Sequence, residues 1–303
     1  MYVRLGEHAK LLPLFEEEFK IVNETQIVNI IDKGITLIDV DTAKSEVEVP
    51  LPEGFDPVSK IGEALRHTIE DEKAAPEEKA TAVYDHSIKM MQSLLTEPSK
   101  ENILSGKAMI SDMVSAIMEQ DSLASALSKI TSHDYYTYTH SVNVGMMGVL
   151  LAKEVYGDRS EQNLNELGAG FFLHDLGKCE VPAFLINKPG RLTDEEWEMM
   201  RKHPSFGEKI LHDTGTMTAE CEFIVGQHHE REDGSGYPRG LSSSEIHDYA
   251  RICSVVDVYD ALSSERAYKK ALSPFESLKI MKEEMIHHFH KEVFEKFVMI
   301  FTH

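Results

Sequence analysis

Cysteine is scarce in this chain of 303 residues. Its three cysteines, Cys179, Cys221 and Cys253, lie far apart in the sequence and form no C-x-x-C pair. This spacing excludes a disulfide framework and a zinc site built on cysteine. The scarcity fits a reducing compartment, and we therefore expect a cytoplasmic protein.

Long apolar runs are missing as well. The longest nearly uncharged stretch, residues 142–152, contains glycines and is far shorter than the ~20 residues that a membrane-spanning helix needs. Residues 1–7 show neither the apolar segment nor the small-residue cleavage site of a secretion signal. The sequence therefore predicts neither a membrane span nor export.

Positive charge is in deficit. The chain has 31 Lys and Arg residues against 52 Asp and Glu residues, which gives a formal net charge of −21. A surface of this sign repels duplex nucleic acid unless a local cationic site intervenes. Hydrophobic residues still make up 42% of the chain, which is enough for a packed core. The length corresponds to about two domains of roughly 150 residues each.

The N-terminal part has a mixed pattern. Residues 24–33 carry apolar side chains at helical spacing, and Gly34 ends that predicted helix. Residues 35–40 are rich in β-branched side chains, and residues 46–49 alternate in polarity, so both segments are predicted strands. We therefore expect a small α+β module here.

The rest of the chain is predicted to be helical. A charged, proline-interrupted stretch at residues 70–79 is typical of a solvated linker. We assign residues 1–75 to the α+β module with its linker, for which a regulatory role is a hypothesis, and residues 76–303 to an all-α domain. Helical periodicity predicts helices at residues 78–95, 102–119, 121–131, 135–156, 163–176, 193–212, 217–229, 244–262, 274–289 and 291–302.

Several histidines and aspartates occupy inward faces of these helices. His140 shares a stripe with Val144 and Leu151, and Asp175 follows Leu167 and Phe171 on one face. A carboxylate on an apolar face is costly unless it is paired or bound to a cation. The same inward placement is predicted for His140, His174, Asp175, His203, His228, His229 and Asp257.

A single inward histidine is more often a hydrogen-bonded core residue than a metal ligand. Five imidazoles and two carboxylates in one helical core, however, match the ligand demand of two borderline metal ions. Because adjacent side chains on a helix diverge by about 100°, His228 and His229 suit two neighbouring ions better than one. The sequence therefore predicts a two-metal centre.

These residues lie in motifs that resemble a known family. His174-Asp175-Leu176-Gly177-Lys178 resembles the HD motif of metal-dependent phosphohydrolases, and residues 228–238, with Gly236-Tyr237-Pro238, resemble the signature of the HD-GYP subfamily. The resemblance covers about residues 100–303, and residues 1–60 are similar to the small domain that precedes many HD-GYP domains. Supporting matches are Tyr138-Thr139-His140-Ser141, Asn187-Lys188-Pro189-Gly190, His203-Pro204 and the run from Ala250 to Lys269.

The resemblance implies an all-α HD-type fold and assigns roles to single residues. Asp175 would bridge two metal ions, which makes Asp175 and Lys178 the candidate catalytic residues. Lys178, Arg266 and Lys269 would contact substrate phosphates, and Tyr237 would shape the rim of the site. The implied metal ligands are His140, His174, Asp175, His203, His228, His229 and Asp257.

The implied activity is cleavage of the bacterial second messenger cyclic di-GMP, first to linear pGpG and often on to GMP. In the family, the Gly-Tyr-Pro loop is also linked to docking of GGDEF-type cyclases. Two metal ions ~3.5–4 Å apart lower the pKa of a bridging water and neutralise the phosphate, so the chemistry of the site supports this activity independently. Iron or manganese is expected first, with nickel and zinc as alternatives.

The expected number of metal ions is two. Some HD-GYP members carry a glutamate one helical turn before the first histidine, where it helps to hold a third ion. Here Tyr136 occupies that position and Asp134 lies on another side of the helix, while Glu230 is expected to accept a hydrogen bond from a ligating imidazole. We therefore predict a binuclear site that opens the cyclic substrate and processes pGpG slowly.

Three other functions stay open beside cyclic di-GMP hydrolysis. One is hydrolysis of 3′,3′-cyclic GMP-AMP, because the motifs do not show the base preference. Another is a weakly active receptor or scaffold that docks GGDEF partners, against which the complete ligand set argues. A third, a different nucleotide phosphohydrolase, is disfavoured by the Gly-Tyr-Pro signature. Dimerisation of the chain stays open as well.

Overall fold

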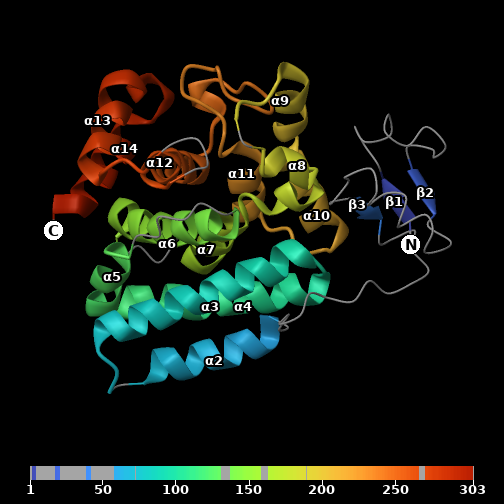
Figure 1. Cartoon of the computed structure of the whole chain (residues 1–303). Coiled ribbons are helices and arrows are strands. Elements are labelled where there is room, and N and C mark those ends of the chain that lie inside the picture. The colour runs from blue at the N-terminus through green and yellow to red at the C-terminus, as the bar shows by residue number, and fades with distance from the viewer. Residues whose placement is uncertain are drawn as a thin grey trace. The chain divides into compact units, whose positions relative to one another are not determined.

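The computed structural model describes residues 58–71, 73–130, 137–157, 163–188, 190–265 and 270–302, together with three short N-terminal strands (Figure 1). The chain divides into two compact units, Met1–Phe55 and Asp56–His303. No helix within the described residues has both the length and the apolar character to cross a membrane.

The N-terminal unit contains an antiparallel sheet with the strand order β2-β1-β3. Its strands are β1 (Tyr2–Arg4), β2 (Glu18–Lys20) and β3 (Asp39–Asp41). In β1, Val3 pairs with Phe19 on one side and with Val40 on the other. The strand predicted at residues 35–40 overlaps β3 at its end, whereas the helix predicted at 24–33 and the strand predicted at 46–49 lie outside the described residues.

The second unit is helical throughout its described residues, which confirms the predicted all-α domain. Its longer helices are α2 (Val58–Glu70), α3 (Pro76–Thr96), α4 (Lys100–Glu119), α5 (Asp121–Ser128), α6 (Thr137–Tyr156), α7 (Leu164–Leu173), α9 (Asp194–Met200), α10 (His203–Asp213), α11 (Ala219–Gln227), α12 (Asp248–Ser263), α13 (Pro274–Glu284) and α14 (Lys291–Met299). Its short elements are α8 (Ala183–Ile186), η2 (Leu176–Glu180), η3 (Ser243–Glu245), η4 (Ile286–His288) and η5 (Ile300–Thr302).

The helical unit begins before the boundary predicted at residue 76. Helix α2 packs against α3 and α4, because Val58, Ile61 and Leu65 form a buried stripe along one of its faces. The helical spacing of these side chains is visible in the sequence. The predicted domain boundary nevertheless lies after α2, because it is based on the charged stretch that follows this helix.

The helices form layers around α6 and α7. Helices α2, α3 and α4 lie side by side on one side of this pair (Figure 1). Helices α10 and α11 follow next to α7, and α12 and α14 pack against α6. Helices α9 and α10 are separate, because residues 201 and 202 form a turn and His203 begins α10, whereas the sequence predicts one helix over residues 193–212.

Two glycines allow backbones to approach closely beside the future site. A Cβ atom on Gly145 of α6 would collide with the ring of Phe172 on α7. A Cβ atom on Gly177 of η2 would overlap the backbone carbonyl of His203 at the start of α10. These contacts bring the ends of α6, α7 and α10 together, and with them the histidines that these segments carry.

Candidate metal centre

The structure brings the seven predicted ligand side chains into one cluster. His140 lies on α6, His174 and Asp175 follow α7, His203 begins α10, His228 and His229 follow α11, and Asp257 lies on α12. Five different segments therefore contribute donors, which is why no local sequence window contains the site.

Asp175 occupies the centre of the cluster. Its Oδ2 atom is 3.4 Å from the Nε2 atoms of both His140 and His174. Its Oδ1 atom is 3.1 Å from Nε2 of His203 and 3.9 Å from Nε2 of His228. The two carboxylate oxygens thus face two different groups of imidazoles, as a ligand shared between two ions must do.

The donor atoms form two groups with metal-ligand spacing, in each of which all atoms lie within 4.8 Å of one another. One group is His140, His174 and Asp175, and the other is Asp175, His203, His228 and His229. Asp257 connects them, because its two oxygens lie 3.1 Å from His140 Nε2 and 3.4 Å from His229 Nδ1.

Backbone carbonyls orient three of the imidazoles. The Nδ1 atom of each ring lies at hydrogen-bonding distance from a carbonyl oxygen, so this nitrogen carries the proton and donates it. The bonds are His174 Nδ1 to Phe171 O at 2.8 Å, His203 Nδ1 to Met200 O at 2.8 Å, and His228 Nδ1 to Val225 O at 3.0 Å. Each Nε2 atom consequently presents a lone pair to the centre.

These lone pairs face one another at short range. His203 Nε2 is 3.2 Å from His228 Nε2, and His174 Nε2 is 3.3 Å from His140 Nε2. The Oδ1 atom of Asp175 is buried and has no hydrogen-bond partner among the described residues. Converging lone pairs and an orphaned carboxylate oxygen repel one another unless cations lie between them, so the donor set fits metal ions.

The protonation states also suit metal binding. Burial, together with the neighbouring His174 and His203, lowers the pKa of His228 to about 3. Burial alone would raise the pKa of Asp175, but Lys178 and His174 outweigh it and hold this pKa well below its ordinary value. At neutral pH the centre therefore offers a neutral His228 and an ionised Asp175.

A buried chain of hydrogen bonds supports His140 from behind. Its Nδ1 atom is 2.6 Å from Oδ2 of Asp260, which also accepts a 2.7 Å hydrogen bond from Asn143 through Oδ1. Tyr84 donates in turn to the Asn143 side chain at 2.7 Å. Sequence reasoning gave Asp260 no role, although it lies three residues after Asp257 on the same helix, and that spacing was the available signal.

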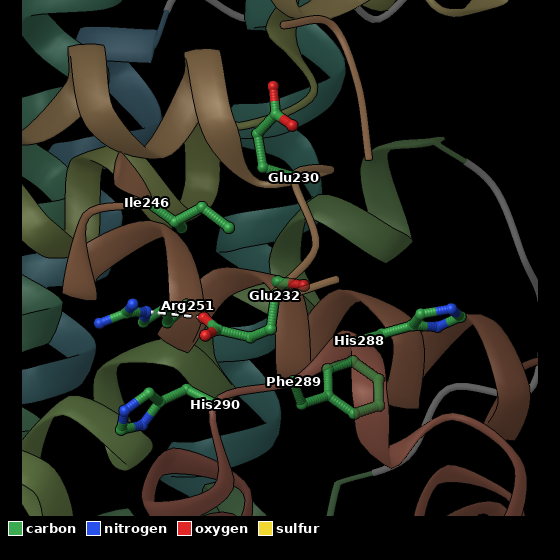
Figure 2. A pocket seen from close by; sticks show the side chains of 8 residues that line it. Glu230, Glu232, Ile246, Arg251, His288, Phe289 and His290 are labelled. Carbon is green, nitrogen blue, oxygen red and sulfur yellow. Dashed lines mark hydrogen bonds and ion pairs between the residues drawn. The ribbon is translucent and has the colours of Figure 1, made fainter. Parts of the chain in front are cut away.

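The predicted role of Glu230 is wrong. Its buried carboxylate accepts hydrogen bonds from the backbone N–H groups of Arg239 at 2.7 Å and Leu241 at 2.9 Å, so it holds the Gly-Tyr-Pro loop and not an imidazole. Figure 2 shows that Glu230 points away from Glu232, which reaches Arg251 instead, at 2.8 Å. Backbone N–H groups within reach of a buried carboxylate satisfy it fully, so no imidazole is needed as a partner.

The loop that follows His229 returns to the cluster. The backbone N–H of Tyr237 donates to the carbonyl of His229 at 3.1 Å, and the ring of Tyr237 lies 4.5 Å from the His229 ring, centroid to centroid. Gly236 makes this return possible, because a Cβ atom there would collide with the backbone of Glu230 and Arg231.

Comparison with known proteins finds a matching domain and a similar fold. Residues 151–293 match the model of the HD domain, and the range contains Asp175, Asp257 and the Gly-Tyr-Pro loop. A solved structure, Bd1817, described as an HDG"Y"P protein from Bdellovibrio bacteriovorus, is similar with a TM-score of 0.68 at 20% identity, over 80% of this chain and 78% of that one.

Curated relatives extend the comparison. Cyclic di-GMP phosphodiesterase PA4108 of Pseudomonas aeruginosa is 36% identical over 63% of this chain and 45% of its own length. A cyclic di-GMP phosphodiesterase of Thermotoga maritima is 39% identical over 45% of this chain and 37% of its own. The 3′3′-cGAMP-specific phosphodiesterase 3 of Vibrio cholerae is 35% identical over 50% and 32%. This chain therefore spans less than half the length of each of these relatives.

Residues 151–293 of the helical unit thus match the HD domain. The cluster in this unit is open on one side, as side-chain exposure shows. His229 is 22% exposed, Lys178 14% and Asp257 10%, whereas the side chains of His203 and Asp175 are each 1% exposed. The candidate metal centre is therefore reached past His229 and the neighbouring Tyr237.

The predicted substrate contacts of the centre are only partly described. Lys178 lies at the centre, with its Nζ atom 2.5 Å from Oδ2 of Asp175. Arg266 and Lys269 lie outside the described residues, as does Tyr136, on which the predicted number of metal ions depends. These three assignments stay predictions.

A third group of possible ligands lies outside the candidate metal centre. Asp233 is 3.8 Å from His287 Nε2 and 3.7 Å from His288 Nε2. The guanidinium of Arg231, however, lies 3.5 Å from the same His288 nitrogen. A cation in that place opposes a metal ion, so we assign no metal to this group.

Proposed function

We propose that this protein is a metal-dependent phosphodiesterase that hydrolyses cyclic di-GMP to pGpG, and pGpG more slowly to GMP. The observation that carries the proposal is the position of Asp175, whose two oxygens face two groups of inward imidazole lone pairs. The names of the similar P. aeruginosa and T. maritima proteins support the choice of substrate.

In this proposal, two ions occupy the two donor groups. His140, His174 and Asp257 would hold one ion, His203, His228 and His229 would hold the other, and Asp175 would be shared between them. The ions would supply positive charge to the phosphate and would lower the pKa of a bound water molecule. Iron or manganese is our first choice, because borderline ions suit imidazole and carboxylate donors together.

The protein's own residues orient the substrate. Lys178 lies beside Asp175 at the open side of the centre, where its ammonium group donates to a phosphate oxygen of the bound substrate. Arg266 and Lys269 are proposed to add further positive charge. Tyr237 forms the rim beside His229 and restricts the entrance to the centre.

Two extensions belong to the same proposal. Similarity to a 3′3′-cGAMP-specific enzyme makes 3′,3′-cyclic GMP-AMP the second candidate substrate. Docking of a GGDEF-type partner fits the Gly-Tyr-Pro loop, because Pro238 and Arg239 at its tip are exposed. Both extensions use the site already described and require no further chemistry.

The test is a product assay on protein purified anaerobically and loaded with manganese or iron. We expect ring opening of cyclic di-GMP to pGpG, and a fall in turnover of more than about a hundredfold with loss of bound metal in Asp175→Ala, because the shared ligand is gone. The exposed Asp213→Ala on α10 serves as the control and keeps both. Normal metal content and turnover in Asp175→Ala would show that the centre is misassigned.

A further inference from the structure

Arg201 lies between two aromatic rings beside the metal centre. It follows α9 and precedes His203 by two residues. Its guanidinium carbon lies 5.3 Å from the ring centroid of Tyr237 and 5.7 Å from that of Trp197. Such stacking holds an arginine in a defined place while the edge of its guanidinium stays available for hydrogen bonds.

The charge of Arg201 is not neutralised by the described part of the protein. Arg66, Arg239 and Arg251 form ion pairs with carboxylates at 2.7 to 2.8 Å. No carboxylate of the described residues forms an ion pair with Arg201, and its buried Nε atom has no hydrogen-bond partner among them. In a chain of net charge −21, an arginine that attracts none of the many carboxylates is suited to an anion from outside.

Arg201 also lies on the side from which the centre is reached. The Tyr237 ring packs 4.5 Å from the His229 ring and 6.3 Å from the His203 ring, centroid to centroid. His229 is the most exposed of the candidate ligands, at 22%. The guanidinium is therefore separated from the entrance of the centre by one aromatic ring.

We propose that Arg201 binds the second, non-reacting phosphate of a cyclic dinucleotide whose first phosphate lies at the metal centre. This inference rests on the proposed function, because only a substrate with two phosphates uses both places. The metal ions and Lys178 would neutralise the first phosphate, and Arg201 would bind the second together with the charge proposed for Arg266 and Lys269. A guanidinium offers paired donors that match two phosphate oxygens, which an ammonium group does not.

The test uses Trp197, which is the sole tryptophan of the chain and is 41% exposed. Its fluorescence reports ligand binding beside Arg201 without any turnover. The manganese-loaded protein is titrated with the hydrolysis-resistant bis-phosphorothioate analogue of cyclic di-GMP. We expect the dissociation constant to rise about tenfold or more in Arg201→Gln, and less in Arg201→Lys, because charge-assisted hydrogen bonds are lost.

Two controls separate the possible causes. Lys209→Gln removes one positive charge from the exposed face of the neighbouring helix α10 and leaves the dissociation constant unchanged. GMP, which has a single phosphate, is expected to bind wild type and Arg201→Gln alike. An equal loss of GMP affinity would instead assign Arg201 to the base or to the first phosphate and would overturn the proposal.

Activity assays distinguish failure of this inference from failure of the proposed function. If the wild type cleaves cyclic di-GMP and Arg201→Gln binds the analogue as tightly as wild type, the inference is wrong and the function stands. If the wild type cleaves bis(p-nitrophenyl) phosphate but neither binds nor cleaves cyclic dinucleotides, the proposed function is wrong and the inference falls with it.

Discussion

Asp260 lies 2.6 Å from the Nδ1 atom of the candidate ligand His140. Its carboxylate fixes the ring so that Nε2 points to the centre, and it increases the basicity of that nitrogen. Asn143 and Ser264 donate to the other carboxylate oxygen, at 2.7 and 3.2 Å, so Asp260 itself has little freedom to turn. Asp260, which is not itself a candidate metal ligand, thus orients the candidate ligand His140.

Asp260→Asn should therefore weaken metal binding by about ten- to a hundredfold and reduce turnover in parallel, because an amide is a weaker acceptor for the imidazole N–H. Metal titration followed by competition with a chelator measures the affinity. Asp213→Asn, an exposed residue on α10, is the matched control. Unchanged affinity in Asp260→Asn would show that the hydrogen bond to His140 contributes nothing to the centre.

At the scale of elements, the Gly-Tyr-Pro loop depends on a single buried side chain. Glu230 accepts hydrogen bonds from two backbone N–H groups, those of Arg239 at the loop tip and of Leu241 just after it. The loop is thereby closed from inside, and the Tyr237 ring is held against His229. The hydrogen bonds within the loop therefore hold Tyr237 in place at the rim of the centre.

Glu230→Gln should open this loop without removing metal. A glutamine turns one of its two acceptor atoms into a donor, so one buried N–H group loses its partner, at a cost of about 1–3 kcal/mol. Hydrogen exchange should accelerate at the amides of Arg239 and Leu241, and KM for cyclic di-GMP should rise. The exposed Glu222→Gln in the first turn of α11 is the control. Loss of bound metal would contradict the role assigned here.

For the whole molecule, the net charge of −21 opposes an anionic substrate at long range. Attraction must come from charges close to the centre, among which Lys178 and Arg201 are described. Salt screens distant charges more strongly than near ones, because the Debye length is about 10 Å at 0.1 M. Long-range repulsion by the net charge and attraction by the charges near the centre therefore respond differently to ionic strength.

We expect kcat/KM for cyclic di-GMP to stay constant or to rise by about twofold when the salt concentration is raised from about 20 to about 200 mM, because long-range repulsion is screened first. Steady-state kinetics at several salt concentrations measure this. Bis(p-nitrophenyl) phosphate, with a single negative charge, should respond less. A steep fall with added salt would show that long-range attraction steers the substrate, contrary to the charge of the chain.

The sequence alone determined which side chains point inward. Helical periodicity placed His140, Asp175 and Asp257 on apolar faces, and all three are buried, because burying apolar stripes dictates how each helix is oriented. Such features depend on a few neighbouring residues, and these are visible in one window of sequence.

Only the tertiary structure decided how these side chains combine. Three contacts join segments that are far apart in the chain. The two carboxylate oxygens of Asp175 face different histidines, Asp260 supports His140, and Arg201 stacks on Tyr237. Their distances depend on how closely helices approach, which contacts such as that of Gly177 against α10 determine. Periodicity specifies the direction of a side chain, whereas its partner is specified by packing between elements.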